Sequence, residues 1–115
     1  MTQRIWLQAY LYFAFRANDF RDRVIESLEK LKVALAKETR QTKDMLQIYR
    51  LQTQGLASDS EIREANKQFR DLLKGMGLGV LIVLPFSPIT LPLVVKLGRK
   101  LGVEVLPDSF KDAGL

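Results

Sequence analysis

The chain has 115 residues and a formal net charge of +5, and it contains neither cysteine nor histidine. A chain of this length is expected to form a single hydrophobic core. The missing residue types exclude disulfides, thiol nucleophiles, imidazole bases and the usual zinc ligand sets. No constellation of carboxylates, lysines and hydroxyls indicates catalysis, so we predict a non-enzymatic protein without a cofactor. The basic excess suits an anionic partner such as phospholipid or RNA.

The first predicted element is an aromatic helix over residues 4–16, which contains the stretch "IWLQAYLYFAF" at 5–15. Tryptophan and tyrosine favour the headgroup zone of a bilayer, so this helix is a candidate interfacial anchor. A helix that packs against the protein's own core is the favoured interpretation.

A long charged helix is predicted over residues 19–54, because apolar residues recur there at helical spacing. The apolar stripe comprises Val24, Leu28, Leu31 and Leu35 and resumes at Met45, Ile48, Tyr49 and Leu51. Packing within the chain is favoured over a coiled coil with a second copy, since the seam covers few heptads. Gly55 is expected to end this helix as a C-cap glycine.

A third helix is predicted over residues 58–74 and completes a charged helical region over 1–74. Ser58 followed by Glu61 fits a capping box at its start. Its apolar face comprises Ile62, Ala65, Phe69, Leu72 and Leu73.

Residues 75–101 form an apolar segment, in which positions 75–95 carry no charge although Pro85, Pro88 and Pro92 interrupt them. The length suits one membrane span, but interior prolines disfavour a straight helix. We therefore predict two half-helices, over about 78–84 and 88–101. Ser87 is the candidate N-cap of the second half-helix, with Pro88 at its first position.

In this arrangement Pro92 is an interior defect of the second half-helix, and Gly102 follows its end. The predicted fold class is all-α, with long charged helices, a proline-broken apolar segment that is a possible single membrane insert, and a short tail over 102–115. Broken helices are tolerated at membrane depth where protein or water satisfies the backbone. Membrane contact is favoured, and a buried helical hairpin in a soluble domain is the alternative.

The apolar segment and its flanks resemble the leucine-zipper, EF-hand-containing transmembrane protein family (Letm-like), in particular its short bacterial members. The resemblance covers about residues 38–110. The matching positions are Asp71 before the segment, "LPF" with Pro85 and Phe86, "TLP" with Leu91 and Pro92, Lys96, and the "LPDSF" ending with Leu106, Pro107 and Phe110.

The resemblance implies residence in an inner or cytoplasmic membrane, cation/proton exchange or ion homeostasis, and ribosome binding near the membrane. Exchanger members carry a glutamate two residues after the Pro-Phe pair, whereas this chain has Pro88 there. An intramembrane carboxylate is the natural place to bind a cation or proton, and the apolar segment has none.

Candidate contacts with lipid phosphates or other anions are Lys74, Lys96, Arg99 and Lys100, although snorkelling at helix ends also explains such residues. Asp71 either accepts a cation or is a solvated or salt-bridged carboxylate, and the second is favoured. In "LPDSF", Asp108 or Ser109 is expected to cap a short turn while Phe110 packs back on the protein.

Three functions are consistent with these features. The favoured one is a membrane-associated Letm-like protein that acts by binding lipid and a ribosome. The second is a component of a cation/proton exchanger, which requires a homo-oligomer and Asp71 in place of the missing glutamate. The third is a soluble helical interaction module that buries the apolar segment.

Overall fold

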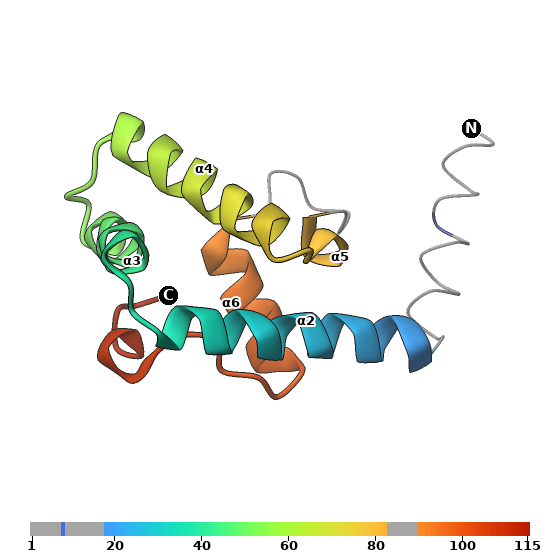
Figure 1. Ribbon diagram of the computed structural model, residues 1–115. Helices are drawn as coiled ribbons and strands as arrows, with labels where there is room; N and C mark the ends of the chain where they lie inside the picture. The colour runs from blue at the N-terminus through green and yellow to red at the C-terminus, as the bar shows by residue number, and fades with distance from the viewer. Residues whose placement is uncertain (1–7, 9–17, 83–89) are drawn as a thin grey trace.

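The structure is a computed structural model that describes residue 8 and residues 18–82 and 90–115. Within these ranges the chain is all-helical, which confirms the all-α part of the predicted fold class (Figure 1). The elements are α2 (Asn18–Ala36), α3 (Arg40–Thr53), α4 (Asp59–Gly75), α5 (Gly79–Ile82), α6 (Leu91–Lys100) and the 3-10 helix η1 (Asp108–Phe110). The predicted helix over 4–16 lies outside the described residues.

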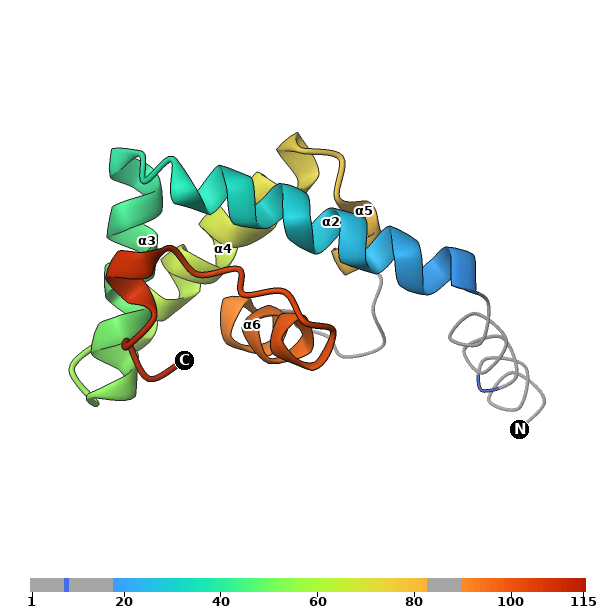
Figure 2. The same ribbon diagram turned by 90° about the horizontal axis from the view of Figure 1, so that it is seen from below.

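The helices enclose a core between α2 on one side and the α3–α4 hairpin on the other. In Figure 1, α6 runs from the side of α4 to the side of α2 and crosses the direction of α2, and Figure 2 shows α6 foreshortened beside it. The tail after α6 returns towards α3, where Thr53 donates a hydrogen bond to the Ala113 carbonyl at 2.9 Å. The tail is therefore part of the folded unit.

The predicted single helix over 19–54 is wrong, because the chain breaks between α2 and α3. Glu38 has a positive φ of 45°, and the Thr39 side chain caps α3 by accepting from the Thr42 amide at 3.2 Å. Threonine competes for local backbone groups and favours such caps over helix interiors. The break lets α3 turn back towards the core.

The predicted helix ends at Gly55 and Gly102 are confirmed: α3 ends at Thr53 and α6 at Lys100, and each glycine follows shortly after. Both glycines have positive φ, 72° and 83°, a conformation that other residues adopt at a cost. The amide of the next residue donates back to the last helical turn: Leu56 to Leu51 at 2.9 Å, and Val103 to Gly98 at 2.7 Å. These bonds are those of a Schellman motif, which satisfies free carbonyls at a helix end.

The capping box at the start of α4 is also confirmed. The Glu61 amide donates to Ser58 Oγ at 3.2 Å, and the Ser58 amide donates to Glu61 Oε1 at 2.9 Å. The hydrogen bond from the Ser58 amide, followed by that of the Ser58 side chain, holds the pKa of the Glu61 carboxyl below its ordinary value. Helix α4 therefore begins where Ser58 and Glu61 predict.

The start of α6 differs from its prediction. Thr90 is the N-cap and Pro92 lies in the first turn, where a backbone N–H has no helical acceptor and its loss costs little. Pro92 is thus a start signal, and describing it as an interior defect is wrong. The expected cap at Ser87 and Pro88 lies outside the described residues.

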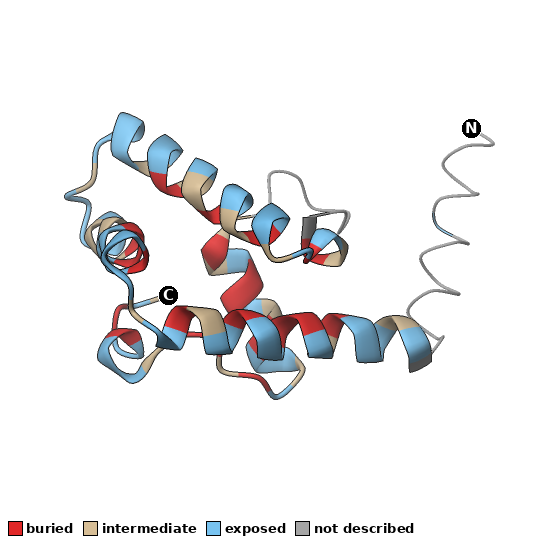
Figure 3. Cartoon of the chain, viewed as in Figure 1, coloured by how far each residue is buried: buried red, intermediate tan, exposed pale blue. Residues whose placement is uncertain are grey.

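A single core joins the charged helical region, the apolar segment and the tail. Figure 3 shows buried residues on the faces that α2 and α4 turn towards each other. From the apolar segment, the core contains Leu78, Leu81, Leu91, Val94 and Val95, each at most 2 % exposed. The expectation that this segment meets lipid is therefore wrong for these five side chains, which the protein itself covers.

No helix in the described ranges combines the length and the hydropathy that a bilayer crossing requires. Within the apolar segment, the described helices are α5, with four residues, and α6, with ten residues.

Candidate functional site

Three apolar residues on which the family resemblance was based lie in the core. Leu91, Leu106 and Phe110 are 0 %, 2 % and 7 % exposed. Pro107 precedes η1 and its carbonyl accepts from the Phe110 amide at 2.9 Å, so the proline sets the turn that returns Phe110 to the protein. These motif residues shape the fold, whereas Pro85 and Phe86 lie outside the described residues.

Phe110 packs back as predicted and is covered by a cation. The guanidinium carbon of Arg50 lies 4.4 Å from the centre of its ring, and Arg50 Nη2 donates to the Ser109 carbonyl at 2.6 Å. The expected capping by Asp108 or Ser109 is wrong, because no side chain caps η1. The Ser109 hydroxyl instead donates to Glu38 Oε1. Glu38 lies at the break between α2 and α3.

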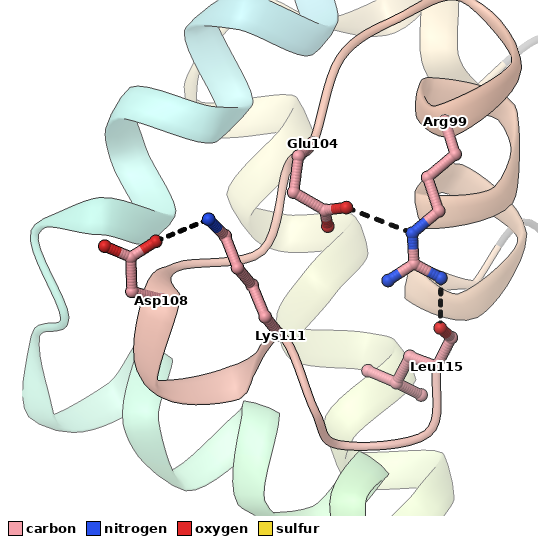
Figure 4. Close-up of polar contacts among 5 residues, drawn as sticks. All are labelled: Arg99, Glu104, Asp108, Lys111 and Leu115. Carbon is pink, nitrogen blue, oxygen red and sulfur yellow. Dashed lines mark hydrogen bonds and ion pairs between the residues drawn. The ribbon is translucent and has the colours of Figure 1, made fainter.

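Asp108 forms an ion pair with Lys111 at 2.7 Å across η1 (Figure 4). The hydrogen bond to Lys111 lowers the pKa of Asp108, and the same bond raises the pKa of Lys111. Both side chains are solvent-exposed, so the pair is worth little to stability.

Helix α6 has two distinct faces. Its inner face comprises the buried residues Leu91, Val94, Val95 and Gly98. Its outer face comprises Leu93, Lys96, Leu97 and Lys100, which recur at intervals of three and four and so form one stripe. On this outer face both lysines are exposed, Leu93 is 45 % exposed and Leu97 is half-buried.

Arg99 lies off the outer face of α6 and binds the protein itself. Figure 4 shows its side chain between Glu104, to which Nε donates at 3.1 Å, and the backbone oxygen of Leu115, to which Nη1 donates. A guanidinium held by a carboxylate is a poorer candidate for an anion than a free ammonium. Lys96 and Lys100 are therefore the two predicted cationic contacts on α6 that share its outer face.

Lys74 is exposed in the last turn of α4. Figures 1 and 2 place the end of α4 and the end of α6 on different sides of the molecule. The structure therefore does not bring Lys74 together with the cations of α6.

Asp71 is exposed on α4 and lines a cleft between α3 and α4. The cleft has a volume of about 430 Å³ and is lined by Gln41, Thr42, Met45, Gln68, Asp71, Leu72, Gly75 and Met76. Asp71 has no ion pair within 4.0 Å among the described residues. Within the described residues, the solvated interpretation of this carboxylate is therefore the one that fits.

The described residues contain no group of three or more carboxylates arranged to hold a metal ion. Comparisons with protein-family models, with curated proteins and with solved structures gave no match to this chain. Sequence reasoning missed both the outer face of α6 and the cleft. The spacing of Leu93, Lys96, Leu97 and Lys100 was a readable signal for the first, whereas the cleft joins residues of two helices.

Proposed function

We propose that this protein is a Letm-like, membrane-associated protein that acts by binding, with the outer face of α6 as its contact with the lipid surface. The observation that carries the proposal is the pairing of two exposed lysines with Leu93 and Leu97 on one face of a helix whose other face is buried. A helix with this composition lies in the plane of the interface and does not cross the bilayer.

The two kinds of side chain contribute in different ways. Lys96 and Lys100 can place their aliphatic stems among lipid chains while the ammonium groups reach the phosphates. Each lysine near an anionic surface contributes about 1 kcal/mol. Burying the remaining exposed surface of the two leucines adds about 1–2 kcal/mol, because part of it is already covered by the protein. The binding is therefore weak, specific for anionic lipid and sensitive to salt.

Vesicle co-sedimentation tests this proposal. The full chain is mixed with vesicles of phosphatidylcholine, alone or with phosphatidylglycerol, at low and high salt. We expect binding only to the anionic vesicles at low salt. Substitution Lys96→Gln with Lys100→Gln should remove most of it.

Arg63→Gln with Lys67→Gln on α4 is the matched control, because both residues are exposed and have the same spacing. Each double variant lowers the net charge from +5 to +3 (5 − 2). Equal loss of binding in the two variants would mean that net charge alone acts, and would refute a specific role for α6.

The resemblance adds a ribosome at the membrane as a partner, and ion homeostasis or membrane-protein biogenesis as the process served. Ribosome binding is tested by sedimentation of the chain with purified ribosomes in the absence of vesicles. Co-migration that survives the α6 double substitution would separate the ribosome contact from the lipid contact.

The second candidate function is a helical interaction module that does not use the membrane. It is favoured by the burial of Leu78, Leu81 and Leu91, which are at most 2 % exposed. Monodisperse behaviour in detergent-free buffer, together with no binding to any vesicle, would select this module over the membrane-associated protein.

A further inference from the structure

Helix α2 and the end of α4 border a shallow groove on the surface of the protein. It is lined by Glu26, Glu29, Lys30, Val33, Ala34, Lys37 and Met76. Val33 is 61 % exposed, whereas Ala34 and Met76 are half-buried. The groove therefore has an apolar part that a partner can remove from water, bordered by charged side chains of α2 and of the residue that follows it.

Two of the four charges in the groove compensate each other within the chain. Glu26 and Lys30 form an ion pair at 3.4 Å, one turn apart on α2. Glu29 and Lys37 form no ion pair within 4.0 Å among the described residues. One carboxylate and one ammonium group of the groove are therefore left without an ionic partner in the part of the chain that the structure describes.

These two charges lie symmetrically about Val33. Glu29 lies four residues before Val33 and Lys37 four residues after it, which is about one helical turn in each direction. Lys37 follows the last residue of α2, and its amide donates to the Ala34 carbonyl at 3.3 Å, so the chain still follows the helical path at this point. The uncompensated charge is thus negative on one side of Val33 and positive on the other.

A second copy of the same face supplies both missing partners. When two α2 helices pack antiparallel about a two-fold axis through Val33, Glu29 lies opposite the partner's Lys37. The contact is isologous, so this pairing occurs twice. Parallel packing would instead place like charges opposite each other, which is unfavourable. The charge order of the face is therefore complementary to itself in the antiparallel orientation.

We propose that this face of α2 binds a second copy of the chain in an antiparallel, two-fold dimer, with Val33 on the axis and Glu29 opposite the partner's Lys37. A contact made by one helix face is smaller than the interface of about 1,200 Å² or more that stable complexes bury, so the dimer is weak. The face shares no residue with the outer face of α6, so the dimer does not depend on the proposed lipid contact.

Sedimentation equilibrium of the full chain over a concentration series, without vesicles, measures the association. We expect a monomer–dimer equilibrium with a dissociation constant of about 0.1–1 mM at low salt, and weaker association at high salt because the ion pairs are exposed. A chain that stays monomeric up to several millimolar would overturn the proposal, as would one that forms larger oligomers without a dimer.

Charge reversal at the two uncompensated positions separates a specific face from net charge. Both residues are exposed, so the substitutions leave the core intact. Glu29→Lys raises the net charge from +5 to +7 (5 + 2), and Lys37→Glu lowers it to +3 (5 − 2). We expect each variant alone to dimerise about tenfold more weakly than the wild type, because both ion pairs become repulsive contacts.

An equimolar mixture of the two variants should dimerise as the wild type does, since each variant then meets a partner of opposite charge at both positions. If net charge alone acted, Lys37→Glu would dimerise more strongly than the wild type, and the mixture would lie between the two variants. That result would overturn the proposal.

Val33→Cys tests the position of the axis. The chain has no cysteine, so the variant has a single thiol, which the axis places beside its own copy, within reach of a disulfide. Leu56→Cys is the matched control, because Leu56 is 67 % exposed, lies between α3 and α4 and is not part of the groove.

Under copper-catalysed oxidation, Val33→Cys should form a disulfide-linked dimer at least about fivefold faster than Leu56→Cys, because the dimer raises the effective concentration of its thiol. Adding Glu29→Lys to Val33→Cys should slow the reaction to the rate of the control. Equal rates in the two cysteine variants would overturn the proposed dimer.

Discussion

Replacing Gly98 with alanine tests the contact between α6 and the chain that follows it. A Cβ at Gly98 would lie 2.6 Å from the carbonyl oxygen of Val103 and 3.5 Å from the Val105 side chain. Cβ atoms essentially never come within 3.0 Å of such an atom, so the carbonyl must move. Movement is resisted because the Val103 amide donates to the Gly98 oxygen at 2.7 Å.

Two effects oppose each other in Gly98→Ala. Alanine is favoured over glycine inside a helix by about 1 kcal/mol, whereas overpacking a well-packed site costs about 1–3 kcal/mol. Because the obstructing atom belongs to the backbone, we expect the clash to prevail and the free energy of unfolding to fall by up to about 2 kcal/mol. The melting temperature should fall by several degrees in a domain of this size.

Urea unfolding followed by helical circular dichroism measures the change, with Gly75→Ala as the control. Gly75 ends α4, and a Cβ there meets nothing within 4 Å. The control should gain up to about 1 kcal/mol. Gly98→Ala that is as stable as Gly75→Ala would refute the packing of α6 against residues 103–105.

Phe110→Ala should lower the free energy of unfolding by about 3–5 kcal/mol because it empties a core position; a loss below about 1 kcal/mol would mean that the tail is not part of the core. Ser58→Ala should cost about 1 kcal/mol. An NMR titration should also show the pKa of the Glu61 carboxyl, which is low in the wild type, rising in this variant. The stability linked to Glu61 is present above its unfolded pKa and is lost as pH falls through the folded pKa. Burial raises the pKa of Tyr49 from 10.0 to about 12, so stability should fall as pH rises through that interval, and Tyr49→Phe should flatten the fall in alkaline unfolding curves.

Local patterns were sufficient for much of the helical structure. The stripe from Val24 to Leu35 predicts a helix and its buried face, and these side chains are at most 3 % exposed. Ser58 with Glu61 predicts the start of α4. These predictions hold because a hydrophobic stripe and a capping side chain act within one or two turns of the chain.

For the apolar segment, local sequence patterns did not predict which surroundings bury it. A run of uncharged residues is compatible with a bilayer and with a protein core, since both bury methylene groups. The pattern also did not predict the break between α2 and α3, nor the partner that Tyr49 finds after it. Tyr49 donates to Asn66 Oδ1 of α4 at 2.5 Å, a contact between residues on two helices.

From its sequence alone, this chain is a basic, all-α protein with one core and with helix ends at Ser58, Gly55 and Gly102. Only the tertiary structure decided that the apolar segment lies largely within that core, that Arg99 is held by Glu104, and that Asp71 and Gln68 line a cleft with α3. The physical reason is that capping and helical periodicity depend on neighbours in sequence. Burial, ion pairing and cleft formation depend on residues that only folding brings together.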